Sequence, residues 1–272
     1  MLTRKELYVM KEDLVDGFMD FAVGTAKKAG AKALAYYGKG DTAVKFDDSL
    51  VTEAELSIRG LFEGELKKLN PLHRIFDEAN EISRQYSHSE NRYLWVIDAI
   101  DGVANFQAGI PIWGISIAML ENFWPVLGVF FMPVTGDIFY SRAGGPAYHV
   151  STVISTSSQE GITDESLLFT FSRFNHHYRT SFPGKIRTMG CAGAHICYVA
   201  MGRAEAAILA NHSFSELAAA SVILESAGGN IFTIEGAEFY LSNYLDGKRI
   251  ADHLVAARAS TLSQVRACLE LI

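Results

Sequence analysis

After residue 150 the sequence alternates short apolar runs with helical segments, and this alternation restricts the fold more than any other feature of the chain. We expect strands at residues 167–171, 204–209 and 254–257, and helices at 192–201, 217–227 and 261–271. Segments that alternate in this way predict helices layered on sheets, which is an α/β architecture.

The first half of the chain has a different order of elements. Two predicted helices, at 11–37 and 52–69, precede a series of strands, which we expect at 74–76, 93–97, 115–120, 126–132 and 138–141. Thr52, followed three residues later by Glu55, is typical of a capping box at the start of the second helix. A stretch rich in serine and threonine begins near Val150 and predicts a domain boundary. We therefore expect an N-terminal domain of residues 1–150 and a C-terminal domain of residues 151–272.

Charge and hydropathy exclude several classes of function. The net charge is −7 and no run of lysine or arginine is longer than a pair, so we expect no nucleic-acid partner. No stretch approaches the roughly 18 apolar residues of a membrane span, so we expect no membrane partner. The N-terminus is charged and lacks the apolar core of a signal peptide, and the three cysteines form no disulfide pattern. These features predict a cytoplasmic protein.

The strongest chemical signal lies between Trp95 and Gly102. An apolar strand runs into Asp98 and Asp101, and the carbonyl of Ile100 between them supplies a third oxygen. Hard cations such as Mg²⁺ prefer such ligands. The residues that follow can open a helical turn whose free N–H groups face an anion. Metal-assisted hydrolysis of a phosphate ester needs a cation site and a phosphate site side by side. Two aspartates at the end of a strand also fit a simple turn.

The run from Asp98 to Phe106 reads Asp-Ala-Ile-Asp-Gly-Val-Ala-Asn-Phe. It resembles the Asp-Pro-Ile-Asp-Gly-Thr-Thr-Asn-Phe motif of the inositol monophosphatase family, and residues 109–117 and 128–133 are similar to the family's next segments. The resemblance spans nearly the whole chain. It implies the layered αβαβα sandwich of the sugar-phosphatase superfamily and a hydrolase that depends on Mg²⁺, with Mn²⁺ as an alternative. It also implies a small phosphate ester as substrate and a homodimer.

The resemblance assigns roles to single residues. Glu78, twenty residues before Asp98, stands in the place of a metal-binding glutamate. The implied metal ligands are Glu78, Asp98, Asp101 and the carbonyl of Ile100. Glu55 stands where the family has an aspartate that orients the attacking water, so it has both a catalytic and a capping interpretation. The implied substrate contacts are Gly102, Val103, Ala104, Gly190, Cys191, Ala192, Ile208, His212 and Ser215.

Several of these positions depart from the family pattern. Counting back from Glu225 puts Ser215 in place of an aspartate that the family uses on its second metal, and Val103 replaces a threonine that bonds the nucleophilic water. Ile208 stands about where inositol-specific members have a glutamate. We do not expect the neighbouring Glu216 to take over the role of the missing aspartate, because one step along a helix turns a side chain by about 100°. Ser213 and Glu216 also fit a capping box.

Three hypotheses follow from this pattern. The first is a Mg²⁺-dependent phosphatase with altered substrate specificity. The second is a pseudoenzyme that keeps a metal or phosphate site and binds a ligand or a protein. The third is an enzyme of different chemistry, in which Cys191, His212 and Ser215 reshape the pocket.

Overall fold

The computed structural model describes residues 12–40, 48–70, 73–76, 92–245 and 248–272. Its α-helices are α1 (Glu12–Ala33), α2 (Asp48–Leu69), α3 (Val103–Ala108), α4 (Ala192–Ala200), α5 (Phe214–Ser226) and α6 (Ala259–Ala267). Two 3₁₀ turns are η2 (Phe174–His176) and η3 (Leu241–Tyr244). None of the helices in these ranges is long and apolar enough to cross a membrane.

Strands β1 to β7 form the first sheet in sequence order, and only the β1–β2 pair is parallel. Their bounds are β1 (Arg74–Ile75), β2 (Tyr93–Asp101), β3 (Gly114–Glu121), β4 (Trp124–Met132), β5 (Asp137–Arg142), β6 (Ala147–His149) and β7 (Thr152–Ile154). The second sheet has the order β10-β8-β11-β13-β12. Its strands are β8 (Leu167–Phe169), β10 (Lys185–Arg187), β11 (Ala206–Leu209), β12 (Asn230–Thr233) and β13 (Leu254–Ala257).

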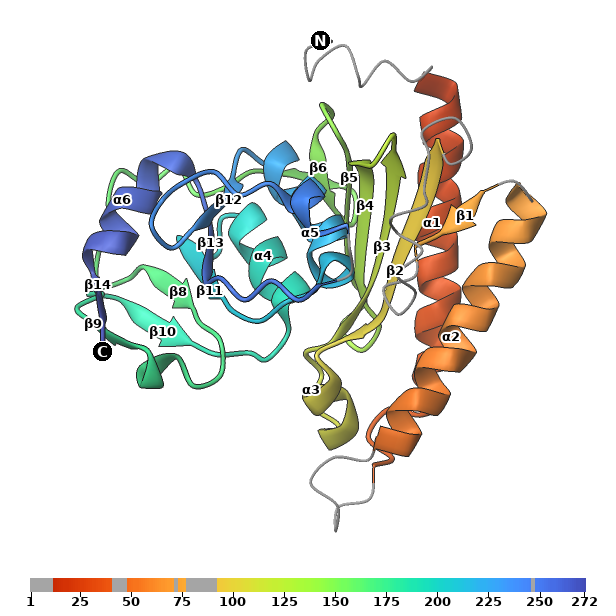
Figure 1. Ribbon diagram of the computed structural model, residues 1–272, viewed down its shortest axis with the longest axis horizontal. Helices are drawn as coiled ribbons and strands as arrows, with labels where there is room; N and C mark the ends of the chain where they lie inside the picture. Colours follow the sequence, from red (N-terminus) through yellow and green to blue (C-terminus); the bar gives the residue numbers. More distant parts are fainter. Residues whose placement is uncertain (1–11, 41–47, 71–72, 77–91, 246–247) are drawn as a thin grey trace.

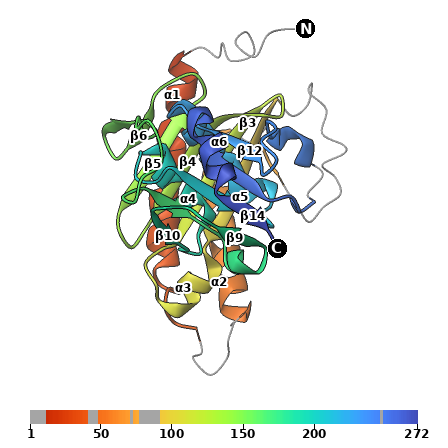
Figure 2. The same ribbon diagram turned by 90° about the vertical axis from the view of Figure 1, so that its left-hand side faces the viewer.

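The elements stack in five layers, which confirms the αβαβα architecture (Figure 1). Helices α1 and α2 cover one face of the first sheet, α4 and α5 lie between the two sheets, and α6 lies on the far side of the second sheet. Figure 2 looks at the molecule from the side of α6, where the short strand β14 (Leu269–Leu271) pairs with β9 (Tyr178–Thr180). The layers place the carboxyl end of β2 beside the start of α4.

Small residues allow the layers to approach closely. Ala22, Ala26 and Ala29 on α1 are fully buried. A Cβ atom at Gly128 of β4 would lie 2.2 Å from the backbone oxygen of Ala219 of α5, so only glycine fits where this helix crosses the sheet. Close packing at native density is sensitive to single added methyl groups, so these positions fix the distance between the layers.

Three expectations about the elements need correction or qualification. The capping box at Thr52 is wrong, because α2 begins at Asp48 and both Thr52 and Glu55 lie inside the helix. The last predicted helix is wrong beyond Ala267, where α6 ends and β14 follows. The first sheet continues to β7, past residue 150, so the division into domains 1–150 and 151–272 stays a prediction.

Candidate active site

A pocket of about 720 Å³ opens between the two halves of the chain, where β2 ends and α4 and α5 begin. Eleven of the residues expected from the sequence line it: Glu55, Asp98, Ile100, Asp101, Gly102, Val103, Gly190, Cys191, Ala192, Ile208 and His212. The helix α2, strand β2, strand β11 and the loops around α4 therefore bring together groups that are more than a hundred residues apart in the sequence.

Two of the remaining expected residues are not part of the pocket lining. Glu78 lies outside the described residues. Ala104 is exposed in the first turn of α3, and Ser215 is partly buried on α5 but is not part of the pocket wall. Neither residue is part of the pocket lining, and their expected contact with the substrate stays a prediction.

An irregularity in β2 lets both aspartates face the same pocket. Side chains three residues apart on a regular strand point to opposite faces. The pairing of β2 with β3 changes register between Asp98, opposite Ser116, and Asp101, opposite Gly114, so β2 carries one extra residue there. A β-bulge of this kind re-aims the side chains around it. The sequence shows the two aspartates but not this bulge.

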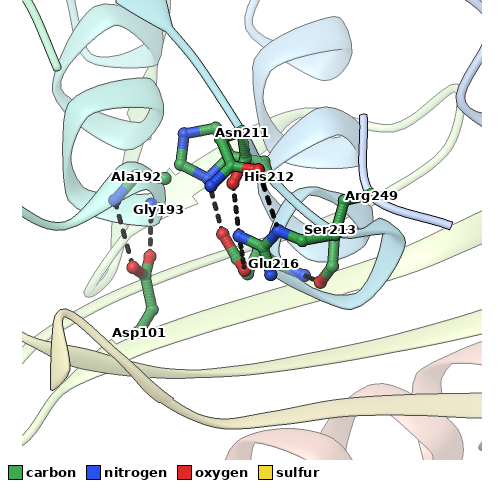
Figure 3. Close-up of polar contacts among 8 residues, drawn as sticks. All are labelled: Asp101, Ala192, Gly193, Asn211, His212, Ser213, Glu216 and Arg249. Atoms are coloured by element: carbon green, nitrogen blue, oxygen red, sulfur yellow. Dashed lines mark hydrogen bonds and ion pairs between the residues drawn. The ribbon is translucent and has the colours of Figure 1, made fainter. Parts of the chain in front are cut away.

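The Asp101 carboxylate is anchored to the start of α4 (Figure 3). It accepts hydrogen bonds from the backbone N–H groups of Ala192, at 3.1 Å, and Gly193, at 2.5 Å. A Cβ atom on Gly193 would lie 2.9 Å from the carboxylate, so glycine is needed for this approach. Burial raises the pKa of Asp101, and these N–H groups oppose the shift. Asp101 therefore joins the two halves of the molecule as well as lining the pocket.

Asp98 carries the buried polar atom that best indicates a cation. Its Oδ2 atom is buried and has no hydrogen-bond partner among the described residues. Burial, together with the charges of Asp101 and Glu216, raises the pKa of Asp98 well above its ordinary value. Burial also raises the pKa of Glu55. A buried carboxylate without a partner is costly, and a hard cation with oxygen ligands would relieve this cost.

The residues present fit a metal ion only in part. Carboxylates gather at one end of the pocket, as a divalent cation requires. In the described part of the chain, however, no three histidine, cysteine, aspartate or glutamate side chains already lie close enough together to hold a metal. The expected ligand Glu78 falls outside that part.

Glu216 lines the pocket, contrary to expectation. Ser213 caps α5, since its hydroxyl accepts the Glu216 N–H. The Glu216 carboxylate, in contrast, lies 2.5 Å from Nδ1 of His212 and 3.3 Å from the guanidinium of Arg249 (Figure 3). Arg249 is also bonded to Asn211 through its Nε atom, at 3.1 Å. Both partners of Glu216 can carry positive charge, so its carboxylate is held in place at the pocket.

Cys191 and His195 are uncharged in this site. Burial and the nearby Asp101 raise the pKa of the Cys191 thiol well above its ordinary value, so the thiol stays protonated. Burial lowers the pKa of His195 to about 4, so the ring is neutral at pH 7. Its Nε2 atom accepts the N–H of Met189 at 3.0 Å, and the ring stacks on Phe169. These contacts give His195 a structural role in holding the loop before α4.

Sequence reasoning missed six titratable residues of the pocket: Arg173, His177, His195, Glu216, Arg249 and His253. Five of them lie in segments without a recognisable motif and reach the pocket only through tertiary folding. The sixth, Glu216, lies next to Ser215, the position at which the sequence count had placed the family's aspartate.

The comparisons with known proteins agree with this geometry. The sequence matches the inositol monophosphatase family over residues 15–268. The chain belongs to this family. A fructose-1,6-bisphosphatase/inositol-1-monophosphatase from Thermotoga maritima is 28% identical over 232 residues, which cover 81% of this chain and 86% of that protein. A histidinol-phosphatase from Chlorobaculum parvum is 29% identical over 230 residues, which cover 81% of this chain and 87% of that protein.

Solved structures of the inositol monophosphatase family show the same fold. An IMPase from Thermotoga maritima superimposes with a TM-score of 0.76 at 23% identity, and the match covers 92% of this chain and 96% of the other. An inositol monophosphatase from Anabaena superimposes with a TM-score of 0.70 at 22% identity, covering 93% and 94% of the two chains.

The family pattern also explains the position of Glu216. The sequence has one extra residue, Ser226, between Glu225 and the Ala-Gly-Gly that ends the motif. Counting back from Gly228 and Gly229 instead of from Glu225 shifts the register by one position. Glu216 then stands where the family has its aspartate. The pocket lining favours this count, because it includes Glu216 and does not include Ser215.

Proposed function

We propose that this member of the inositol monophosphatase family is a metal-dependent phosphomonoester hydrolase with altered substrate specificity. The observation that carries the proposal is the buried Asp98 Oδ2 atom, which has no partner in the described structure and lies in a pocket shared with Glu55, Asp101 and Glu216. A pocket that gathers four carboxylates needs a cation before it can accept a phosphate ester.

Asp98, Asp101 and the carbonyl of Ile100 are the proposed ligands of Mg²⁺, with Mn²⁺ as the alternative metal. Glu78 and Glu216 complete the proposed set. When bound, the ion polarises the phosphoryl oxygens and activates water for attack. Its ligands come from the bulged end of β2 and the start of α5, so the two halves of the chain must remain packed for the site to form.

The other pocket residues have proposed roles that need no metal. Glu55 reaches the pocket from the middle of α2 and orients the attacking water, accepting its proton. Gly102 and Val103 line the pocket beside Asp101, and their backbone N–H groups are the proposed phosphate contacts. Gly102 has a φ of 91°, and a Cβ atom there would lie 3.0 Å from the oxygen of Ile112, so the turn requires glycine.

Two residues support altered specificity. Val103 offers no hydroxyl to the nucleophilic water. Ile208 supplies no carboxylate where inositol-specific members have a glutamate, and its side chain is fully buried in a core cluster of the second sheet. A polyol substrate would lack that hydrogen-bond acceptor for its hydroxyl groups. We propose a small phosphate ester other than an inositol phosphate, and a homodimer on the family resemblance alone.

The two alternatives have less support. A pseudoenzyme with a lost metal carboxylate was inferred from Ser215, but Glu216 supplies a carboxylate to the pocket. The hypothesis of different chemistry relied on Cys191, His212 and Ser215. The Cys191 thiol stays protonated, His212 pairs with Glu216, and Ser215 lies outside the pocket wall.

The proposal is tested by measuring phosphate release from a panel of phosphomonoesters with Mg²⁺ and with Mn²⁺. The control is Asp98→Asn, which keeps the shape of the side chain but removes its charge. Release by the wild-type protein far above that of the variant supports the proposal. Equal release by the two proteins on every ester contradicts it.

A further inference from the structure

A second group of pocket residues lies at one edge of the second sheet. Strands β8 and β11 are parallel, and β13 is antiparallel to β11. The carboxyl ends of β8 and β11 and the start of β13 therefore meet at the same edge of the sheet. The loop after β8 contributes Arg173 and His177, and His253 immediately precedes β13. We call these three residues the basic wall.

The two histidines of the basic wall form one cluster with Phe171. The rings of His177 and His253 lie 5.0 Å apart, and Phe171 lies 5.7 Å from the first and 5.0 Å from the second. Arg173, at the start of η2, has a φ of 67°. This left-handed conformation is disfavoured for arginine, and such residues are often found at functional sites. The paired histidines and the fixed backbone at Arg173 thus form part of the pocket lining.

The Arg173 and His177 side chains of the basic wall are exposed and line the pocket, where a ligand can reach them. Within the described ranges, neither the Arg173 guanidinium nor the His177 ring makes a side-chain hydrogen bond or an ion pair. The Nδ1 atom of His253 lies 2.6 Å from the Tyr178 hydroxyl, which leaves Nε2 as the remaining polar atom of that ring. When Tyr178 donates this bond, the neutral ring carries its proton on Nε2 and is a donor there.

The other cationic groups of the pocket differ, because they already have acidic partners. Arg249 and His212 both contact Glu216. Two carboxylates near His253, Glu235 and Asp252, belong to a neighbouring cavity of about 480 Å³ and do not line the main pocket. The pocket therefore has an acidic end at Asp98 and Asp101 and a second end at the basic wall, whose Arg173 and His177 have no acidic partner within the described ranges.

We propose that the basic wall binds a second anionic group of the substrate, so that the preferred phosphate ester also carries a phosphate or a carboxylate. This inference rests on the proposed function, because it assigns the scissile phosphate to the acidic end. A pocket of about 720 Å³ has room for a ligand that reaches both ends. A second anion on the substrate would give the exposed Arg173 guanidinium a charged acceptor, and such charge-assisted hydrogen bonds strengthen binding.

The test uses two matched pairs of substrates with the full-length protein and Mg²⁺. Fructose 1,6-bisphosphate is compared with fructose 1-phosphate, and 3-phosphoglycerate with glycerol 3-phosphate. The first pair adds a phosphate and the second replaces a hydroxymethyl group by a carboxylate, so the pairs distinguish the two kinds of anion. We expect kcat/KM to be higher for the doubly anionic member of at least one pair. Arg173→Gln should lower that preference by about 10- to 100-fold.

A matched variant controls for the loss of positive charge. Arg179→Gln removes an exposed arginine on β9 that does not line the pocket, and we expect it to keep the preference within about two-fold. Arg173→Lys should retain part of the preference, because it keeps the charge but not the planar donor geometry. If Arg173 had only a structural role, its replacement would lower kcat/KM equally for both members of a pair. That result would overturn the inference.

The outcomes separate this inference from the proposed function. Turnover without preference in either pair overturns the basic wall as an anion site and leaves the phosphatase proposal standing. If no substrate is turned over, calorimetry with the Asp98→Asn protein decides the inference. In that case the proposed function fails. The basic wall is still supported if the doubly anionic member of a pair binds more tightly and Arg173→Gln abolishes this difference in affinity. Equal binding within each pair overturns the basic wall.

Discussion

The Nδ1 atom of His212 lies 2.5 Å from one carboxylate oxygen of Glu216, and the guanidinium of Arg249 lies 3.3 Å from the other. The carboxylate is thus held between two groups that can carry positive charge, at the first turn of α5 and at the edge of the pocket. A cation near Asp98 must therefore compete with His212 and Arg249 for this carboxylate. Two predictions depend on this arrangement.

The first prediction distinguishes Glu216 from Ser215 as the functional residue of α5. Glu216→Gln removes a charge from the pocket, so we expect kcat/KM for phosphate esters to fall by about 100-fold or more. Ser215→Ala should change it by less than about three-fold, because Ser215 does not line the pocket. Steady-state phosphate release measures both. If Ser215→Ala lowered kcat/KM more than Glu216→Gln does, residue 215 and not Glu216 would correspond to the family's aspartate.

The second prediction concerns the competition between Arg249 and a metal for Glu216. Arg249→Gln removes a positive charge beside the carboxylates, so we expect Mg²⁺ to bind about two- to ten-fold more tightly. Arg249 is more than half exposed, so added salt should reduce the difference. Titration calorimetry at low and high ionic strength measures it, with Arg179→Gln as the control. Weaker Mg²⁺ binding by the Arg249 variant would show that the arginine supports the metal site.

The sequence predicted those features that depend on neighbouring residues. The apolar strand before Asp98 and the two aspartates are local, and the family motif extends over adjacent residues, so the layered fold and most of the acidic end were identified. Glu55 was found as well, although the capping box assigned to it was wrong because α2 begins earlier than the Thr52 signal. A Thr-x-x-Glu pattern inside an amphipathic segment can start a helix or lie within a longer one. Here the helix already begins at Asp48, and Thr52 lies within it.

Features that depend on tertiary contacts were not predicted. Asp101 binds N–H groups of α4 more than ninety residues away, and no local pattern carries that information. Arg173 and His253 line one pocket only because β8 ends and β13 begins at the same edge of one sheet. The bulge in β2 and the pairing of β14 with β9 likewise follow from the partner strands. The one-position error at Glu216 came from a single additional residue before the glycines.

Val103 gives the third prediction. It lines the pocket but has no hydroxyl to bond the attacking water. Val103→Thr adds a donor and acceptor with almost the same shape, so we expect kcat to rise by about 10-fold or more while the fold is unchanged. Val103→Ala is the matched control, and it should not raise kcat. If the threonine variant is no faster than wild type, the water is oriented by other groups such as Glu55.

The fourth prediction follows from the raised pKa of Asp98. The folded protein binds a proton at Asp98 more readily than the unfolded chain does, because burial and the neighbouring carboxylates raise its pKa well above the ordinary value. This contribution to stability is present below the ordinary pKa of about 4 and is lost as the pH rises through the raised pKa. Without metal, Asp98→Asn should therefore raise the melting temperature at pH 7, and the gain should shrink towards pH 4.

Thermal unfolding in a metal chelator, followed at several pH values, measures this difference. Asp164→Asn is the control, because Asp164 is exposed and outside the pocket, and it should show no such pH dependence. Adding Mg²⁺ should stabilise the wild-type protein more than the Asp98→Asn variant, since a ligand that binds only the folded state stabilises it. Equal stability of the wild type and the Asp98 variant at pH 7 without metal would contradict an unpaired buried charge.

The last prediction compares two glycines with opposite surroundings. A Cβ atom at Gly128 would lie 2.2 Å from the backbone oxygen of Ala219, whereas one at Gly60, on the exposed face of α2, would meet nothing within 4 Å. Gly128→Ala forces α5 away from the first sheet, so we expect a loss of about 1–3 kcal/mol in the free energy of unfolding. Gly60→Ala should stabilise the protein by about 0.5–1 kcal/mol, because alanine loses less conformational entropy in a helix. Urea unfolding of both variants measures the two changes. Because α5 also carries Glu216, the Gly128 variant should lose phosphatase activity even where it remains folded, and full activity in that variant would show that the pocket tolerates movement of the helix.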